Sequence, residues 1–340
     1  FANAYVSLPI AITVEGANIL TRTLMIFGQG AIRCHPYALN EIKALTEGDV
    51  KGFDENFWAH IGHVVRNKAR AFMLSITRGK LASSPVGGPA SRYFKKLAWT
   101  SASFAFFADI ALGSYGGALK MKEKIAGRYA DILSYMYLAA STLRRFEAEG
   151  RRKEDEVYFK WAMDYIFYRI QIAFEGILKE IKVPGLTWVF RLAGVWSRVN
   201  PIGTYPSDYL GHKVASAMQT VGEQRDRITD GTYIPKDPTE AVGRYENALN
   251  LIISAGPVYK KMYVAMKKRD LPKASMDKLI DPALEKGIIN KEEADLARKA
   301  EDARNDAIQV DEFTLEEYMY ETPTAPIGKG LETKDVSKIM

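Results

Sequence analysis

The stretch LKMKEKIAGRYADILSYMYLAASTLRRF, residues 119–146, places an apolar residue at every third or fourth position. The members of this stripe are Ile125, Tyr129, Ile132, Met136, Ala139 and Leu143. An α-helix completes a turn in about 3.6 residues, so this spacing puts the whole stripe on one face of a long helix. A half-buried β-strand would instead show strict alternation with a period of two. The stretch therefore predicts a long helix with one buried face.

The same spacing recurs along the chain. In residues 154–181 the apolar stripe is Met163, Phe167, Ile170, Phe174, Ile177 and Ile181. Further helices are predicted over 54–77, 91–112, 241–268, 273–286 and 290–308. The helix over 241–268 is expected to be interrupted near Pro257, and Asn290 is expected to cap the last helix. Glycine and proline clusters at 84–89, 116–117, 184–185 and 200–206 separate these segments. With no hairpin signal and no repeat, the sequence predicts an all-α fold.

Composition limits the class of protein. The chain has 340 residues, 47% hydrophobic and 26% charged, which is typical of a globular protein. Its single cysteine excludes an intrachain disulfide framework and indicates a reducing compartment. No uncharged stretch reaches the length of about 18 residues that a membrane span needs, so no transmembrane helix is expected. Because the sequence begins at Phe1, we expect an excerpt of a longer protein.

The segment with the clearest chemistry lies near the beginning. Glu15 stands among isoleucines and valine and is followed at once by Gly16. A carboxylate that loses its hydration has a raised pKa and becomes a better base near neutral pH. Taken alone, the pattern favours a structural role for Glu15, either in a buried pair with Arg22 or at the start of a helix.

Several motifs together resemble one enzyme family. The segment VEGANILTR, residues 14–22, is similar to the Glu-Gly-Thr motif with a downstream arginine that acyl-CoA dehydrogenases carry in their C-terminal helical domain. The longer runs IFGQGAIRCHPY (26–37), HIGHVVRNKARAF (60–72), SITRGK (75–80), DILSYMYLAASTLRRFEAEGR (131–151), GHKVA (211–215) and KGIINKEEADLARKAEDAR (286–304) resemble the long bacterial FadE-type members. The resemblance extends over almost the whole chain.

This resemblance implies roles for individual residues. Glu15 matches the catalytic base that removes the α-proton of an acyl-CoA thioester, and Gly16 matches the glycine of the motif. The backbone of Gly16, Ala17 and Asn18 is implied to contact FAD. Ala17 and Ile19 differ from the threonine and glutamine usual in the family, so side-chain contacts to FAD from these two positions are not implied. Arg22 matches the downstream arginine and is expected to be structural.

The resemblance also implies an organisation and a reaction. Residues 1–45 would end the dehydrogenase C-terminal domain, 46–320 would form an appended helical module, and 321–340 a loosely ordered tail. The implied reaction oxidises a fatty acyl-CoA to the trans-2-enoyl-CoA in β-oxidation. The implied partners are electron-transfer flavoprotein or an equivalent acceptor and further copies in a homo-oligomer. The implied location is the bacterial cytoplasm. The alternative function is a non-catalytic helical module for oligomerisation or membrane docking.

Two weaker signals remain. His60 and His63 lie three residues apart on a predicted helix, but no HExxH pattern accompanies them, so we predict no metal site. Residues 184–205 combine tryptophans with Arg191 and Arg198. This composition is typical of a segment that binds the anionic surface of the inner membrane, and also of a packed corner between helices. The packed corner is the favoured interpretation, because aromatic residues are common in cores. No motif indicates nucleic-acid binding.

Overall fold

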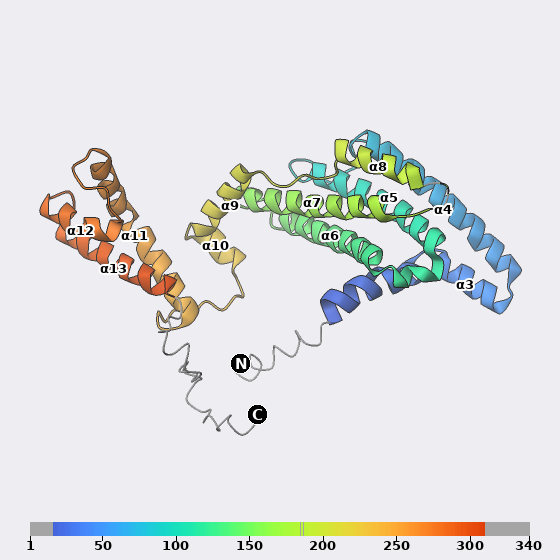
Figure 1. The fold of residues 1–340 in the computed structure, drawn as a ribbon, viewed down its shortest axis with the longest axis horizontal. Helices are drawn as coiled ribbons and strands as arrows, with labels where there is room; N and C mark the ends of the chain where they lie inside the picture. The colour runs from blue at the N-terminus through green and yellow to red at the C-terminus, as the bar shows by residue number, and fades with distance from the viewer. Residues whose placement is uncertain (1–15, 184, 186, 310–340) are drawn as a thin grey trace, which may run out of the picture. The chain divides into compact units, whose positions relative to one another are not determined.

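The computed structural model describes residues 16–183, 185 and 187–309. Every regular element within these residues is helical, which confirms the predicted all-α fold (Figure 1). The chain divides into two compact units, residues 1–226 and 227–340. This division falls inside the segment 46–320 that we predicted as one appended module. The two units are described separately.

The first unit contains most of the helices. In chain order they are η1 (Gly16–Gln29, a π-helix), α2 (Gly30–Cys34), α3 (Ala38–Glu47), α4 (Val50–Ile76), α5 (Ser91–Tyr115), η2 (Gly116–Met121, a 3₁₀-helix), α6 (Glu123–Ala148), η3 (Lys153–Asp155, also 3₁₀), α7 (Glu156–Glu180), α8 (Thr187–Val199), α9 (Asp208–Gln219) and α10 (Glu223–Ile228), which crosses the boundary.

The core of this unit lies where α6 and α7 pack side by side (Figure 1). On α6 the predicted stripe is buried at every position except Met136, which packs partly buried against the core. On α7 every member of the predicted stripe up to Ile177 is buried, and Ile181 is buried just beyond the end of the helix. Burying one such side chain contributes about 1.5–3 kcal/mol, so this interface is a main source of the unit's stability.

Helix α5 completes the core between α4 and α6. It buries Tyr93 and Trp99 together with the small residues Ala102, Ala108 and Ala111. The segment Ser91–Met121 is long and apolar enough to cross a membrane by length and composition alone. A core helix passes the same test, and α5 contributes its buried face to the same hydrophobic core as α6 and α7.

The connection between α8 and α9 lies directly on α7. The buried Gln171 amide accepts a hydrogen bond from the Ile202 N–H (2.9 Å) and donates to the carbonyl (3.0 Å) and hydroxyl (2.8 Å) oxygens of Ser197. At Gly203 the backbones approach so closely that a Cβ would lie 2.4 Å from the carbonyl carbon of Phe167. Only glycine fits there without displacing α7.

The described part of the second unit, residues 227–309, packs three helices around a core of its own. Its helices are α11 (Ala241–Lys267), α12 (Met276–Glu285) and α13 (Lys291–Ile308). Asn290 caps α13 as predicted, because its side chain accepts from the Glu293 N–H (2.8 Å) while the Glu293 carboxylate accepts from the Asn290 N–H (3.1 Å). These reciprocal bonds form a capping box.

The predicted interruption at Pro257 is wrong, because α11 continues through it. A proline inside a helix removes one backbone hydrogen bond, a cost that tertiary packing can outweigh. Ala255, Val258 and Met262 are buried on both sides of the proline, and α11 packs against α13. Burial of these flanking residues holds the two halves in one helix.

Candidate functional site

The predicted catalytic and flavin-contacting residues lie at the edge of the described chain. Glu15 lies outside the described residues. The backbone of Gly16, Ala17 and Asn18 forms the start of η1. The roles predicted for these four residues therefore stay predictions.

The helix that follows Glu15 is attached to α6 at two points. The Arg22 guanidinium donates two hydrogen bonds to the Asp131 carboxylate, each 2.6 Å long, and this interaction raises the pKa of Arg22. Gly127 leaves room for the pair, since a Cβ there would lie 3.1 Å from the Arg22 guanidinium. Phe27 is buried and stacks on Tyr129 with ring centroids 4.2 Å apart. Arg22 thus makes the kind of contact expected of a structural residue.

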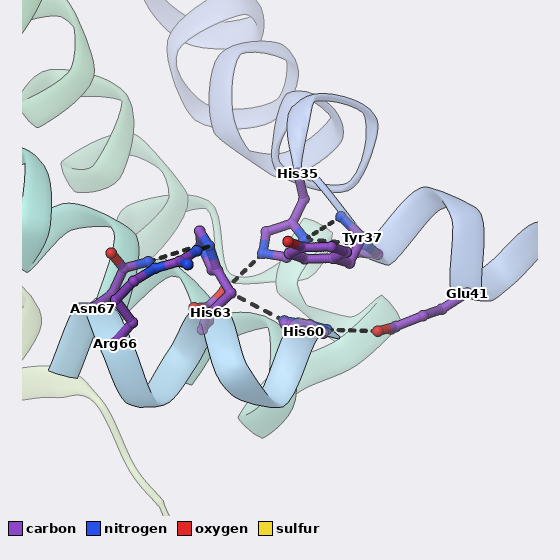
Figure 2. A network of polar contacts seen from close by, with 9 residues as sticks. His35, Tyr37, Glu41, His60, His63, Arg66 and Asn67 are labelled. Atoms are coloured by element: carbon purple, nitrogen blue, oxygen red, sulfur yellow. Dashed lines mark hydrogen bonds and ion pairs between the residues drawn. The ribbon is translucent and has the colours of Figure 1, made fainter. Parts of the chain in front are cut away.

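A cluster of histidines and carboxylates lies where α2, α3, α4 and α5 of the first unit meet (Figure 2). We call it the His–Asp cluster. Its members are His35 at the end of α2, Glu41 on α3, His60 and His63 on α4, and Asp109 on α5. Of these residues, only His60 and His63 were singled out from the sequence.

His35 joins the start of α3 to α5. Its Nδ1 accepts hydrogen bonds from the backbone N–H groups of Tyr37 (3.2 Å) and Ala38 (3.0 Å). Its Nε2 lies 2.8 Å from Oδ1 of Asp109. Since Nδ1 receives two donors, the ring proton of neutral His35 belongs on Nε2, from which it is donated to Asp109.

His60 lies between two carboxylates. Its Nδ1 is 2.8 Å from Oε1 of Glu41, and its Nε2 is 3.6 Å from Oδ1 of Asp109. Figure 2 shows Glu41 reaching from α3 toward His60. The His60 and Glu41 side chains are 19% and 17% exposed, so water screens these contacts only in part. Both ring nitrogens of His60 therefore face an acceptor.

His63 is bonded within its own helix. The Asn67 amide lies 2.8 Å from its Nε2, and Arg66 lies near its Nδ1. Burial lowers the pKa of His63, which favours its neutral form.

Within the described residues, one group has the spacing to hold a metal ion: atoms of His35, His60 and Asp109 that all lie within 4.8 Å of one another. The His35 nitrogen in this group carries the ring proton, so it has no free lone pair for a metal. The remaining two residues fall short of the three protein ligands usual for zinc. The spacing alone therefore does not make a metal centre.

The segment at 184–205 differs from the favoured interpretation. Of its aromatic residues with a described side chain, Phe190 is buried, whereas Trp188 is 64% and Trp196 48% exposed. Trp188, Leu192, Val195 and Val199 form an exposed apolar stripe on α8 at helical spacing. We call it the α8 stripe. Phe190 therefore fits the packed corner, whereas the α8 stripe is exposed within the part of the chain that the structure describes.

Helix α4 has a similar exposed face. Its members are Trp58, Ile61, Val65, Ala69, Phe72 and Ile76, again three or four residues apart. The Trp196 indole of α8 donates to the Ser75 hydroxyl of α4 (2.8 Å), and the Asn200 amide donates to the Ser75 carbonyl (2.7 Å). The two helices thus meet near the end of α4.

Comparison with models of known protein families identifies the family of the chain. The family model described as "Acyl-CoA dehydrogenase, C-terminal, bacterial type" matches residues 32–313, which include the His–Asp cluster and helices α3 to α13. No solved structure matches the chain.

Proposed function

Because the chain belongs to the bacterial-type acyl-CoA dehydrogenase C-terminal family, we propose that it forms the C-terminal part of a flavin-dependent enzyme that oxidises fatty acyl-CoA to trans-2-enoyl-CoA. The family match over residues 32–313 is the observation that carries this proposal. Fatty acyl-CoA is the proposed substrate, and electron-transfer flavoprotein or an equivalent protein is the proposed acceptor.

In this proposal Glu15 is the base. Its carboxylate takes the α-proton of the thioester, while the β-hydrogen leaves as a hydride. FAD supplies the acceptor for that hydride when it is bound. The start of η1 suits a contact with this cofactor, because the first N–H groups of a helix have no partner within the helix and can donate to an oxygen of a ligand. Gly16 to Asn18 would provide these donors.

The attachment of η1 to α6 supports the assignment in a second way. A catalytic base must be held within about 0.5 Å of its productive position. The Arg22–Asp131 pair and the Phe27–Tyr129 stack fix the helix that begins directly after Glu15. We infer that these contacts position the base.

Replacing Glu15 by glutamine in the full-length enzyme tests the role. Loss of a general base lowers turnover by about 10²–10⁴-fold. The turnover of Glu15→Gln is therefore expected to fall by at least about 100-fold, with its FAD content unchanged. The matched control is Glu285→Gln, at an exposed position at the end of α12, which is expected to keep full turnover. Normal turnover in Glu15→Gln would refute the assignment.

The α8 stripe favours a second function, docking on an anionic membrane surface at the cytoplasmic face of the inner membrane. Exposed tryptophan and aliphatic residues beside arginines are typical of helices that lie in a lipid interface. Arg191 and Arg198 are exposed on the same helix, although Arg198 also lies 3.8 Å from Glu175. Arg145 and Arg151 are less available for contact with lipid, because they form ion pairs with Glu149 and Glu147.

Sedimentation with vesicles tests docking. The full-length protein is expected to sediment with phosphatidylglycerol-containing vesicles and much less with neutral phosphatidylcholine vesicles. The double variant Trp188→Ser with Leu192→Ser should lose this binding, whereas Tyr233→Ser, which removes an exposed aromatic residue from the second unit, should retain it. Equal sedimentation of the double variant and the unaltered protein would argue against docking through α8.

A further inference from the structure

Asp109 raises a question of charge balance. Its side chain is 4% exposed, and its Oδ2 is buried without a hydrogen-bond partner. A buried carboxylate is costly unless a cation or several donors lie beside it. Among the residues that the structure describes, the basic nitrogens within 4.0 Å of this carboxylate belong to His35 and His60.

His35 is a poor carrier of the positive charge. A protonated His35 carries a hydrogen on each ring nitrogen. Its Nδ1–H would then point at the N–H groups of Tyr37 and Ala38, which donate to Nδ1 in the structure. Three N–H donors would point at one another, and the two hydrogen bonds that His35 accepts at the start of α3 would be lost. His63 is also disfavoured, because burial lowers its pKa and its Nε2 accepts from Asn67.

His60 has the geometry that the charge requires. A protonated imidazole has two N–H donors, and the two ring nitrogens of His60 face Glu41 and Asp109. In a neutral His60 whose Nδ1–H bonds Glu41, the lone pair of Nε2 would face the Asp109 oxygen. The other titratable groups near it are His35, Tyr37, whose ring centroid lies 6.0 Å away, and His63, which interacts with it electrostatically.

We propose that His60 is held as an imidazolium that bridges Glu41 and Asp109, and that this bridge is a pH-sensitive latch fixing α3 against α4 and α5. Protonation of His60 stabilises the closed latch, so the stabilisation is present at lower pH and is lost as the pH rises. When His60 is neutral, the two carboxylates lose their shared counter-charge and α3 is held less firmly. This inference is independent of the proposed enzyme reaction.

Two measurements on the full-length protein test the latch. Exchange of the histidine C2 hydrogens, followed by mass spectrometry between pH ~5.5 and ~8.5, reports the charge of each histidine. Amide hydrogen exchange of residues 38–47, corrected for the intrinsic effect of pH, reports the attachment of α3. Since charge-assisted hydrogen bonds contribute about 1.5–3 kcal/mol, exchange in α3 is expected to rise about tenfold or more across this range.

The variants separate the latch from a general pH effect. In His60→Gln the exchange of α3 should lose its pH dependence, because glutamine carries no titratable charge. His212→Gln, at an exposed position on α9, should keep the full pH dependence. If His60→Gln does not fold, the C2 exchange of the unaltered protein still reports the charge of His60.

Three results would overturn the proposal. The first is a neutral His60 at pH ~6, and the second is α3 exchange without pH dependence in the unaltered protein. The third is stoichiometric binding of Zn²⁺ that His60→Gln abolishes and His212→Gln retains, which would make the cluster a metal site. A charged His60 with no Zn²⁺ binding would support the latch.

Discussion

Replacing Gln171 by leucine tests how α7 holds the chain that follows α8. Leucine is similar in size to glutamine, so the change removes hydrogen bonds without opening a large cavity. The Ile202 N–H loses its acceptor, and Ser197 loses the donor to its carbonyl and hydroxyl groups. Gln171 is 3% exposed, so water replaces these bonds poorly.

The magnitude follows from these contacts. A buried donor left without a partner costs about 1–3 kcal/mol, and each lost neutral hydrogen bond costs about 1 kcal/mol. Gln171→Leu is therefore expected to lower the free energy of unfolding of the first unit by about 3 kcal/mol. Tryptophan fluorescence during urea unfolding measures this value, because all 5 tryptophans of the chain lie in residues 1–226.

The matched control is Gln219→Leu, at an exposed position at the end of α9. Substitutions at such positions usually change stability by less than about 0.5 kcal/mol. Hydrogen exchange should also increase in residues 197–203 of Gln171→Leu and stay unchanged in the control. If Gln171→Leu were no less stable than Gln219→Leu, the amide would not hold this segment and the reasoning would fail.

Other contacts lead to further predictions. Gly203→Ala should destabilise the first unit by at least about 2 kcal/mol in the same urea assay, because its Cβ would overlap Phe167, whereas Gly113→Ala on α5 meets open space and should not destabilise it. Asn290→Ala should lower the stability of the second unit by about 1 kcal/mol, measured as faster hydrogen exchange in α13, because it removes the capping bond. Hydrogen bonds from Lys261 and from the Asn290 backbone lower the pKa of Glu293 below its ordinary 4.5, so its contribution is present above pH 4.5 and is lost as the pH falls. Acidification should therefore loosen α13 less in Glu293→Gln than in the unaltered chain, and equal loosening would contradict this.

Periodicity was a sound guide to the helices that form the core. The stripes on α6 and α7 were predictable because each helix buries one face against several neighbours, so the spacing of apolar residues records the packing directly. The interruption predicted at Pro257 was wrong, because burial of the residues on either side outweighs the local preference of proline against helix. The packed corner predicted for the segment of α8 failed for a different reason. An amphipathic pattern does not determine whether the apolar face of a helix packs against protein.

The His–Asp cluster was only half visible in the sequence. His60 and His63 share a helix, so their spacing could be read, but Glu41 and Asp109 come from other helices and meet them only through packing. One signal was present, because Asp109 is the first charged residue after the uncharged stretch 97–108. A lone acid inside an apolar helix is a candidate for a buried carboxylate, so the residue that balances its charge should be sought on the neighbouring helices.

The two contacts between η1 and α6 also limit how the chain can evolve. Arg22 and Phe27 reach Asp131 and Tyr129, so the number of residues between the two anchors is matched to a single stretch of α6. An insertion or deletion between positions 22 and 27 would rotate one anchor away from its partner. Point substitutions should be tolerated there far more readily than changes of length, because the two anchors must keep their separation along η1.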